Sequence, residues 1–234
     1  MIKQFNIENK NVYIHYKKTT LNELPVIILN TYGNEGEDVF EKCTSINSKE
    51  YILVSVTNLD WNNDMSPWFA TKINKNGTDF LGNGDEYLNI LLNKIIPLIE
   101  TYIKSDLNIS IKYYGIAGYS LAGLFAVYAG YKTNMFSKIA SASGSFWFPK
   151  FIEFARENSI SGKIDKIYFS LGDKESKVRN QILAKVEDNT IELERIYKEK
   201  GINTIYEVNS GNHFTDGSMR MAKGIKWILG ENYD

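Results

Sequence analysis

Short apolar runs alternate with helical periodicities along most of this chain. The apolar runs predict strands, and from residue 24 onward their lack of polar alternation is typical of strands buried on both faces of a sheet. Strands are expected at 2–7, 12–17, 24–30, 51–56, from 109 onward, 139–142, 166–171 and 204–208. Apolar residues at helical spacing predict helices at about 37–46, 85–104, 149–158, 178–200 and 217–229. Pro97 should kink the second of these helices.

This alternation of strand and helix indicates a mostly parallel sheet covered by helices on both faces. No internal repeat, low-complexity tract or linker interrupts the pattern, and 234 residues suit one domain with a substantial core. We therefore expect a single α/β domain over residues 1–234. Its ligand site should lie at the carboxyl ends of the parallel strands.

A serine stands at the junction between a predicted strand and an Ala- and Leu-rich helix. Residues 118–123 read Gly-Tyr-Ser-Leu-Ala-Gly. A chain that turns from strand to helix within one residue strains the backbone of that residue and brings strand and helix close together, so its neighbours must be small. This is the logic of the nucleophile elbow, G-x-S-x-G, although Ala122 takes the place of the second glycine. The alternative is that Ser120 is only the N-cap of the helix.

Two phosphate-binding patterns do not fit the same stretch. Gly118 and Gly123 have the spacing of a phosphate-cradling loop, but Leu124 and Phe125 stand where Lys and Ser or Thr are required. The glycines at 115, 118 and 123 do not fit the dinucleotide spacing G-x-G-x-x-G. Nucleotide binding is therefore not expected.

Composition narrows the classes of function further. The chain is 43% hydrophobic, and its formal net charge of −1 predicts neither a nucleic-acid nor an anionic-membrane partner. It has one cysteine, Cys43, no apolar run near the roughly 20 residues needed to span a bilayer, and no signal-peptide features at its N-terminus. We expect a soluble, cytoplasmic protein. Two distant histidines and one cysteine do not make a usual zinc site, and neither a metal nor an organic cofactor is expected.

Candidate catalytic side chains follow the ends of several predicted parallel strands and should therefore meet at one edge of the sheet. Ser120 follows one strand, Asp173 and Glu175 follow the strand at 166–171, and His213 follows the last. The order serine, acid, histidine is that of α/β-hydrolases and differs from the order in the two other common serine-hydrolase folds. His15 lies in an alternating strand pattern and is expected to be structural.

With these residues the chain resembles the esterase-D-like branch of the α/β-hydrolase fold, which contains enterochelin (siderophore) esterases and feruloyl or acetyl xylan esterases. The resemblance covers about residues 24–229, and its marks are the segments 64–67, 118–123, 172–175 and 211–214. It implies an α/β-hydrolase fold and the hydrolysis of esters. It does not identify the substrate, because substrates vary widely among proteins that share a fold.

The resemblance implies a role for each candidate side chain. Ser120 would attack an ester carbonyl, and His213 would take the serine proton and return it to the leaving alcohol. A carboxylate would hold the imidazole in the productive tautomer. The relatives' G-x-x-D/E pattern matches Gly172 and Glu175 and favours Glu175. Asp173 is the alternative, and a Ser–His dyad without an acid is a third arrangement.

Backbone and aromatic groups complete the expected site. The N–H groups of Leu121, at the elbow, and Tyr32, in the turn after the strand at 24–30, should form the oxyanion hole. Four aromatic side chains in loops at this edge indicate a cleft for an acyl or aryl group, with local packing as the alternative for each: Trp61, Trp68, Phe146 and Trp147. Residues 143–166 are too few for a large cap domain, so we expect an open pocket.

A serine carboxylic-ester hydrolase that acts on a small to medium soluble ester is the resulting hypothesis. An acyltransferase or a thioesterase would share the acyl-enzyme step and the same residues, so the sequence does not separate them from it. A non-catalytic hydrolase-fold binding protein would be expected to have lost a catalytic residue, whereas serine, histidine and acid candidates are all present. The natural substrate and the oligomeric state stay open.

Overall fold

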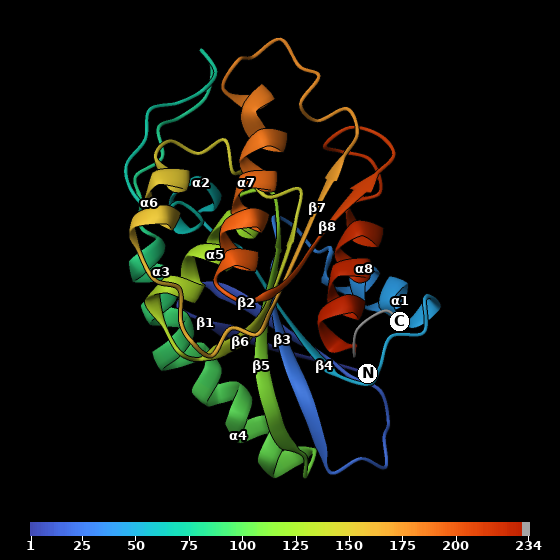
Figure 1. The fold of residues 1–234 in the computed structure, drawn as a ribbon. Helices are drawn as coiled ribbons and strands as arrows, with labels where there is room; N and C mark the ends of the chain where they lie inside the picture. Colours follow the sequence, from blue (N-terminus) through green and yellow to red (C-terminus); the bar gives the residue numbers. More distant parts are fainter. Residues whose placement is uncertain (231–234) are drawn as a thin grey trace.

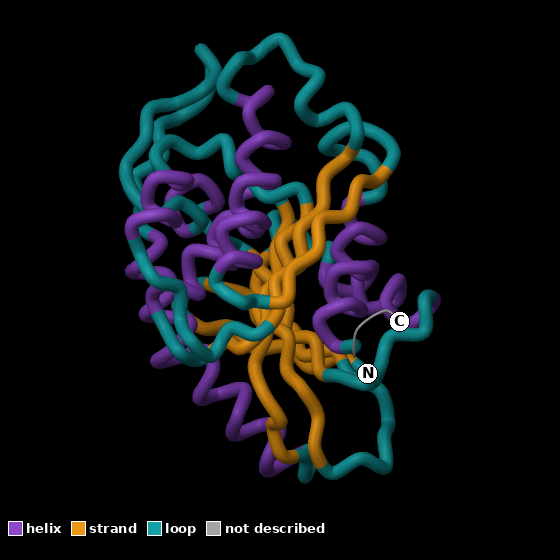
Figure 2. The backbone as a smooth tube through the Cα atoms, in the orientation of Figure 1, coloured by secondary structure: helices purple, strands orange, loops and turns teal. Residues whose placement is uncertain are grey.

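One sheet of eight strands runs through residues 1–230, the part of the chain that the computed structural model describes (Figures 1 and 2). Its strands are β1 (Ile2–Ile7), β2 (Lys10–His15), β3 (Glu23–Asn30), β4 (Ile52–Thr57), β5 (Ser110–Tyr119), β6 (Phe136–Ala142), β7 (Lys166–Gly172) and β8 (Asn203–Asn209). They lie in the order β1-β2-β4-β3-β5-β6-β7-β8. The β1–β2 and β2–β4 pairs are antiparallel, and all the other pairs are parallel. The predicted mostly parallel sheet is confirmed.

Helices cover both faces of this sheet (Figure 1). They are α1 (Gly36–Ser45), α2 (Trp61–Asp64), α3 (Gly84–Ile90), α4 (Ile96–Asp106), α5 (Leu121–Lys132), α6 (Phe151–Glu157), α7 (Val186–Glu199) and α8 (Gly217–Leu229). A π-helical turn (Leu91–Ile95) joins α3 to α4, and a 3₁₀ turn (Leu183–Lys185) precedes α7. The helices α1 and α8 pack together on one face, and the helices α3 to α7 lie on the other. The two faces therefore carry separate helical layers, as in an α/β-hydrolase fold.

Each face of the sheet buries its own hydrophobic core. Because successive side chains of a strand point to opposite faces, β3 contributes Val26 and Ile28 to one core and Ile27 and Leu29 to the other. The helix α5 is buried from its first residue through Gly130, so it has no polar face. This central helix follows Ser120 directly, and its burial fixes the position of the serine backbone.

Two predicted helices differ from the observed ones for local reasons. The helix expected at 85–104 is interrupted by the π-helical turn. Pro97 follows in the first turn of α4, where the lack of a backbone N–H destabilises a helix least. The helix expected at 178–200 begins later, because Asn180 Oδ1 accepts hydrogen bonds from the N–H groups of Ile182 and Leu183. The chain before this point forms a loop at the carboxyl edge of the sheet.

The segment between β6 and β7 contains only the short helix α6 within the described chain, which agrees with the expected lack of a large cap domain. The parallel strands end at the upper edge in Figure 1. Within residues 1–230, no helix is long and apolar enough to cross a bilayer. Cys43 is buried as a free thiol.

Candidate active site

Ser120 occupies a strained backbone position between β5 and α5. Its φ of 60° and ψ of −124° lie outside the regions that a non-glycine residue ordinarily adopts. The turn is so tight that a Cβ atom on Gly118 would lie 2.2 Å from the carbonyl oxygen of Ala122. Glycine is therefore required at 118, while the small, fully buried Ala122 fits where the motif has its second glycine. This is the geometry of a nucleophile elbow.

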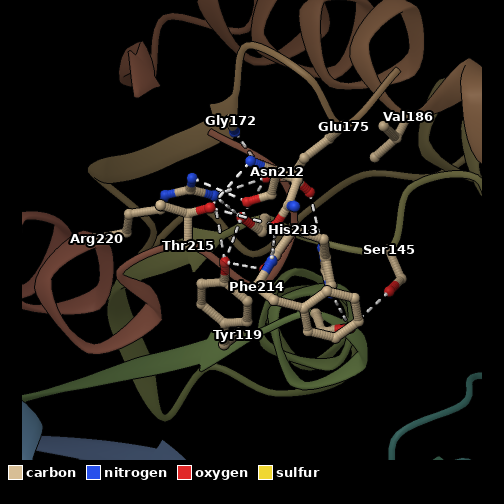
Figure 3. Close-up of polar contacts among 12 residues, drawn as sticks. Tyr119, Ser145, Gly172, Glu175, Val186, Asn212, His213, Phe214, Thr215 and Arg220 are labelled. Atoms are coloured by element: carbon tan, nitrogen blue, oxygen red, sulfur yellow. Dashed lines mark hydrogen bonds and ion pairs between the residues drawn. The ribbon is translucent and has the colours of Figure 1, made fainter. Parts of the chain in front are cut away.

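Three side chains form a hydrogen-bonded series at the carboxyl edge of the sheet, and two of them, Glu175 and His213, are labelled in Figure 3. Ser120 Oγ lies 3.0 Å from Nε2 of His213, and Nδ1 of the same imidazole lies 2.7 Å from Oε2 of Glu175. Ser120 comes from the end of β5, Glu175 from the loop after β7 and His213 from the loop after β8. The Glu175 side chain is almost fully buried, whereas the imidazole is 31% exposed. A reactant can therefore reach the imidazole more readily than the acid.

The surroundings of Glu175 keep its carboxylate ionised. Oε1 accepts hydrogen bonds from the Gly172 N–H (2.6 Å), the Ser143 hydroxyl (2.7 Å) and Nη1 of Arg220 (2.9 Å). Burial by itself raises the pKa of this carboxyl, but the hydrogen bonds from His213, Gly172 and Ser143 outweigh it and leave the pKa below its ordinary value. With Oε1 occupied by three donors, Oε2 is the oxygen that faces the imidazole.

The second acid candidate, Asp173, makes a different contact. Its Oδ1 accepts a hydrogen bond from the backbone N–H of Gly211, at 2.7 Å. It therefore holds the turn that precedes His213, whereas Glu175 contacts the imidazole itself. The structure thus places the two neighbouring carboxylates in separate positions that the sequence could not distinguish.

The two expected oxyanion donors come from the first residue of α5 and from the turn after β3. Leu121 is the first residue of α5, so its N–H has no partner inside the helix. Tyr32 follows β3, and its side chain is 73% exposed and meets the Trp61 ring edge-on, with centroids 5.4 Å apart. Tyr32 and Ser120 line the same cavity.

Two cavities flank the Ser120–His213 pair. The first, of about 520 Å³, is lined on its outer side by Tyr32 and Trp61. The second, of about 340 Å³, is lined by Trp147. Ser120, His213 and the 90% exposed side chain of Phe214 line both cavities. The arrangement offers room on each side of the serine hydroxyl.

The other two aromatic candidates do not line either cavity, and the expectation for them is corrected. Phe146 is fully buried and packs against Phe151 and Phe169, with ring centroids 5.7 and 5.6 Å apart. The indole N–H of Trp68 donates to the carbonyl oxygen of Pro149 at 3.0 Å, and its ring packs in an aromatic cluster near α6. Both side chains therefore belong to the hydrophobic packing on this face of the sheet.

His15 lies at the opposite edge of the sheet from Ser120. It pairs with Leu53 near the start of β4, and its Nε2 lies 3.0 Å from the hydroxyl of Ser55. Burial, together with the nearby N-terminal charge, lowers the pKa of His15 to about 4. Its neutral, buried imidazole is a structural feature. Within residues 1–230, no group of three or more His, Cys, Asp or Glu side chains could hold a metal ion.

Four side chains that complete this site were not predicted from the sequence. Ser145 Oγ lies 3.3 Å from Ser120 Oγ, Tyr119 donates from its hydroxyl to the His213 carbonyl oxygen at 2.7 Å, and Ser143 and Arg220 contact Glu175. The serines follow the predicted strand at 139–142, a position that could have drawn attention to them. Arg220 could have been noticed because it is a charged residue on the apolar face of the terminal helix.

Comparisons with known proteins agree with the observed fold. The family model described as "Putative esterase" matches residues 9–222. Uncharacterized protein YbbA of Bacillus subtilis (strain 168) is 27% identical over 189 residues, which are 78% of this chain and 75% of that protein. The IroE-like serine hydrolase from Shewanella oneidensis has a TM-score of 0.76 at 16% identity, covering 97% of this chain and 78% of its own. Siderophore hydrolase EstA from Aspergillus nidulans has a TM-score of 0.74 at 15% identity, covering 98% and 93%. These structural likenesses show the fold.

Proposed function

Since the chain belongs to the esterase family whose model it matches, we propose that it hydrolyses a carboxylic ester through an acyl-enzyme intermediate on Ser120. One observation carries the proposal. The continuous series Ser120 Oγ, His213 Nε2, His213 Nδ1 and Glu175 Oε2 joins a nucleophile, a base and an acid through contacts of 3.0 and 2.7 Å. This is the constellation that serine hydrolases on unrelated folds use for acyl transfer.

In the first half of the reaction, His213 Nε2 takes the proton of Ser120 as the serine oxygen attacks the ester carbonyl carbon. The negative charge that develops on the carbonyl oxygen would be stabilised by the N–H groups of Leu121 and Tyr32. One such donor in a serine hydrolase contributes about 2.7–4 kcal/mol to transition-state stabilisation. The tetrahedral intermediate then collapses, and the imidazolium gives its proton to the departing alcohol.

In the second half, water takes the place of the alcohol. His213 Nε2 removes a proton from that water as its oxygen attacks the acyl carbon and forms a second tetrahedral intermediate. The intermediate collapses with cleavage of the bond between the acyl carbon and Ser120 Oγ, the carboxylic acid leaves, and the imidazolium returns its proton to Oγ to restore the hydroxyl. Glu175 orients the imidazole through Nδ1 and stabilises its positive charge in both halves. An acyltransferase would differ only in using another alcohol instead of water, and a thioesterase only in its leaving group.

The two cavities favour a substrate with a sizeable group on each side of the scissile bond. A volume of about 520 Å³ falls within the range typical of small-molecule sites. Trp61 and Trp147 each offer an aromatic surface, one in each cavity. Since solved structures that share this fold are named siderophore hydrolases and enterobactin esterases, siderophore-like esters belong among the candidates. A cytoplasmic location and the absence of nucleic-acid and membrane partners stay predictions.

A panel of esters tests the proposed function. We expect the purified protein to hydrolyse p-nitrophenyl acetate, because a small activated ester needs only the nucleophile, the base and the oxyanion donors. Aryl, acetyl-sugar, feruloyl and siderophore esters should then differ in kcat/KM, since only some fill both cavities. Ester formation with an added alcohol in preference to hydrolysis would favour an acyltransferase. A folded protein that turns over no ester and no thioester would contradict the proposal.

Two matched substitutions separate the acid candidates. Glu175→Gln should lower kcat by about 10⁴-fold, because an amide cannot hold the imidazole in the productive tautomer or stabilise its charge. Asp173→Asn should lower kcat by less than about tenfold, because Asp173 contacts only the backbone of the turn at Gly211. Steady-state kinetics with p-nitrophenyl acetate measures both. If Asp173→Asn lost more activity than Glu175→Gln, Asp173 rather than Glu175 would be the acid. Activity that survives both changes would favour a Ser–His dyad.

A further inference from the structure

A buried arginine lies behind the acid of the candidate triad. The Arg220 side chain, from the first turn of α8, is 1% exposed, and its Nη1 lies 2.9 Å from Oε1 of Glu175 (Figure 3). A charge in this environment is costly unless it is paired and hydrogen-bonded. Hydrophobic residues fill most neighbouring positions of α8, including Met221, Ala222 and Ile225. The cation therefore stands out from the helix that carries it.

The guanidinium contacts the ends of four strands. Nη1 donates to Glu175 Oε1 after β7, to the Ser143 hydroxyl after β6 (3.1 Å) and to the Tyr119 hydroxyl at the end of β5 (3.3 Å). Nη2 donates to the carbonyl oxygens of Ser210 and Asn212 after β8, at 3.1 and 3.0 Å. These strand ends carry the nucleophile, the acid and the base. One planar group thus connects the segments whose relative positions decide the triad geometry.

The contacts reach the imidazole from two directions. On the acid side, Arg220 helps to occupy Oε1 of Glu175, which leaves Oε2 for Nδ1 of His213. On the backbone side, it holds the carbonyl oxygen of Asn212, and the Tyr119 hydroxyl that it contacts donates to the His213 carbonyl oxygen. The fork of donors in arginine suits this task, whereas the single ammonium of a lysine reaches fewer partners.

The local backbone leaves space for this group. A Cβ atom on Gly172 would lie 2.7 Å from Nη2 of Arg220 and 2.3 Å from the carbonyl oxygen of Gly211. The strand β7 can therefore approach the guanidinium and the turn before His213 only because glycine ends it. This close approach also allows the Gly172 N–H to donate to Glu175 Oε1.

We propose that Arg220 is a positioning residue that sets the geometry of the Glu175–His213 pair by fixing both the carboxylate and the turn that carries the imidazole. The proposal rests on the proposed function for its catalytic consequence. The positioning itself is argued from contacts among residues of this chain alone. An ion pair that served only to stabilise the fold would leave the imidazole contact unchanged after a conservative replacement.

Arg220→Lys tests the proposal, with Arg220→Met as the uncharged variant. The lysine keeps the buried charge, so this variant is expected to fold. Its single ammonium cannot, however, bind both the Glu175 carboxylate, the partner of Nη1, and the Asn212 carbonyl oxygen, a partner of Nη2. We expect kcat for p-nitrophenyl acetate to fall by about 10²-fold, while KM changes by less than about threefold, because a small misplacement of the base affects the transition state more than substrate binding. Arg220→Met should lose more activity than Arg220→Lys.

Proton NMR of the resting enzyme provides a readout that a merely structural role would not move. The Nδ1 proton of His213, held by Glu175, should give a far-downfield resonance that disappears with His213→Ala. We expect Arg220→Lys to shift or broaden this resonance. Lys223→Met is the matched control, because Lys223 is another cation of α8, paired with Glu207 outside the triad. It should leave the resonance and kcat unchanged.

The outcomes separate this proposal from the proposed function. A folded Arg220→Lys variant with the wild-type resonance and a kcat within about threefold of wild type would overturn the positioning role. A wild-type protein that hydrolyses no ester would refute the proposed function alone, because the resonance reports the Glu175–His213 contact without substrate. A shifted resonance in that protein would still support the role of Arg220.

Discussion

Ser120→Ala should lower kcat for p-nitrophenyl acetate by about 10⁶-fold, the loss typical when a serine hydrolase loses its nucleophile. The hydroxyl is the only part of the residue removed, and alanine meets the same strained φ of 60°, so the melting temperature should change little. A fluorophosphonate probe should label the wild-type protein at Ser120 and leave the variant unlabelled. Mass spectrometry of the labelled peptide identifies the site.

Ser55 provides a matched control for the nucleophile. Its hydroxyl also lies 3.0 Å from an imidazole nitrogen, that of His15, but it sits in the middle of β4 and is buried. Ser55→Ala should therefore keep both turnover and labelling. Labelling that persists in Ser120→Ala, or a wild-type protein that is folded yet unlabelled, would contradict the assignment of the nucleophile.

The second large effect concerns the base. His213→Ala should lower kcat by about 10⁶-fold, because among residues 1–230 the hydrogen-bond partner then left to Ser120 Oγ is the hydroxyl of Ser145, which is too weak a base to take the serine proton. His15→Ala should leave kcat unchanged, because His15 contacts Ser55 at the opposite edge of the sheet. Kinetics at one pH, with melting temperatures to correct for unfolded protein, compares the two variants. Equal losses would overturn the assignment of the base.

The parts of the fold that the sequence predicts are those with a strong local signal. Continuous apolar runs identified the parallel strands, because strands buried on both faces leave no room for polar alternation. The predicted start of the helix after β7 was wrong. The side chain of Asn180 accepts a hydrogen bond from the backbone N–H of Ile182, and helical periodicity does not reveal such a contact. The π-helical turn before Pro97 was not predicted, because such a turn has no clear sequence signature.

In the candidate site, too, the residues that could be predicted are those with a strong local signal in the sequence. Ser120 and His213 could be named because strand-end positions and small residues leave a pattern along the chain. The choice between Glu175 and Asp173 depends on which way two neighbouring side chains turn, and spacing does not determine that. Two residues show errors of opposite kinds. Phe146 was expected at the cleft but lies in the core, whereas Arg220 was not expected at the site but contacts Glu175 there.

The short connection between β6 and β7 has a consequence for how this protein could acquire new substrates. Within the described chain only α6 is inserted there, so this connection adds no separate cap domain that the ligand must fit. Selectivity is left to exposed loop residues such as Tyr32 and Phe214, which contribute little to either core. Mutation at these positions can change which ester is accepted while the sheet and its helices keep their stability, so such a scaffold is well suited to directed evolution.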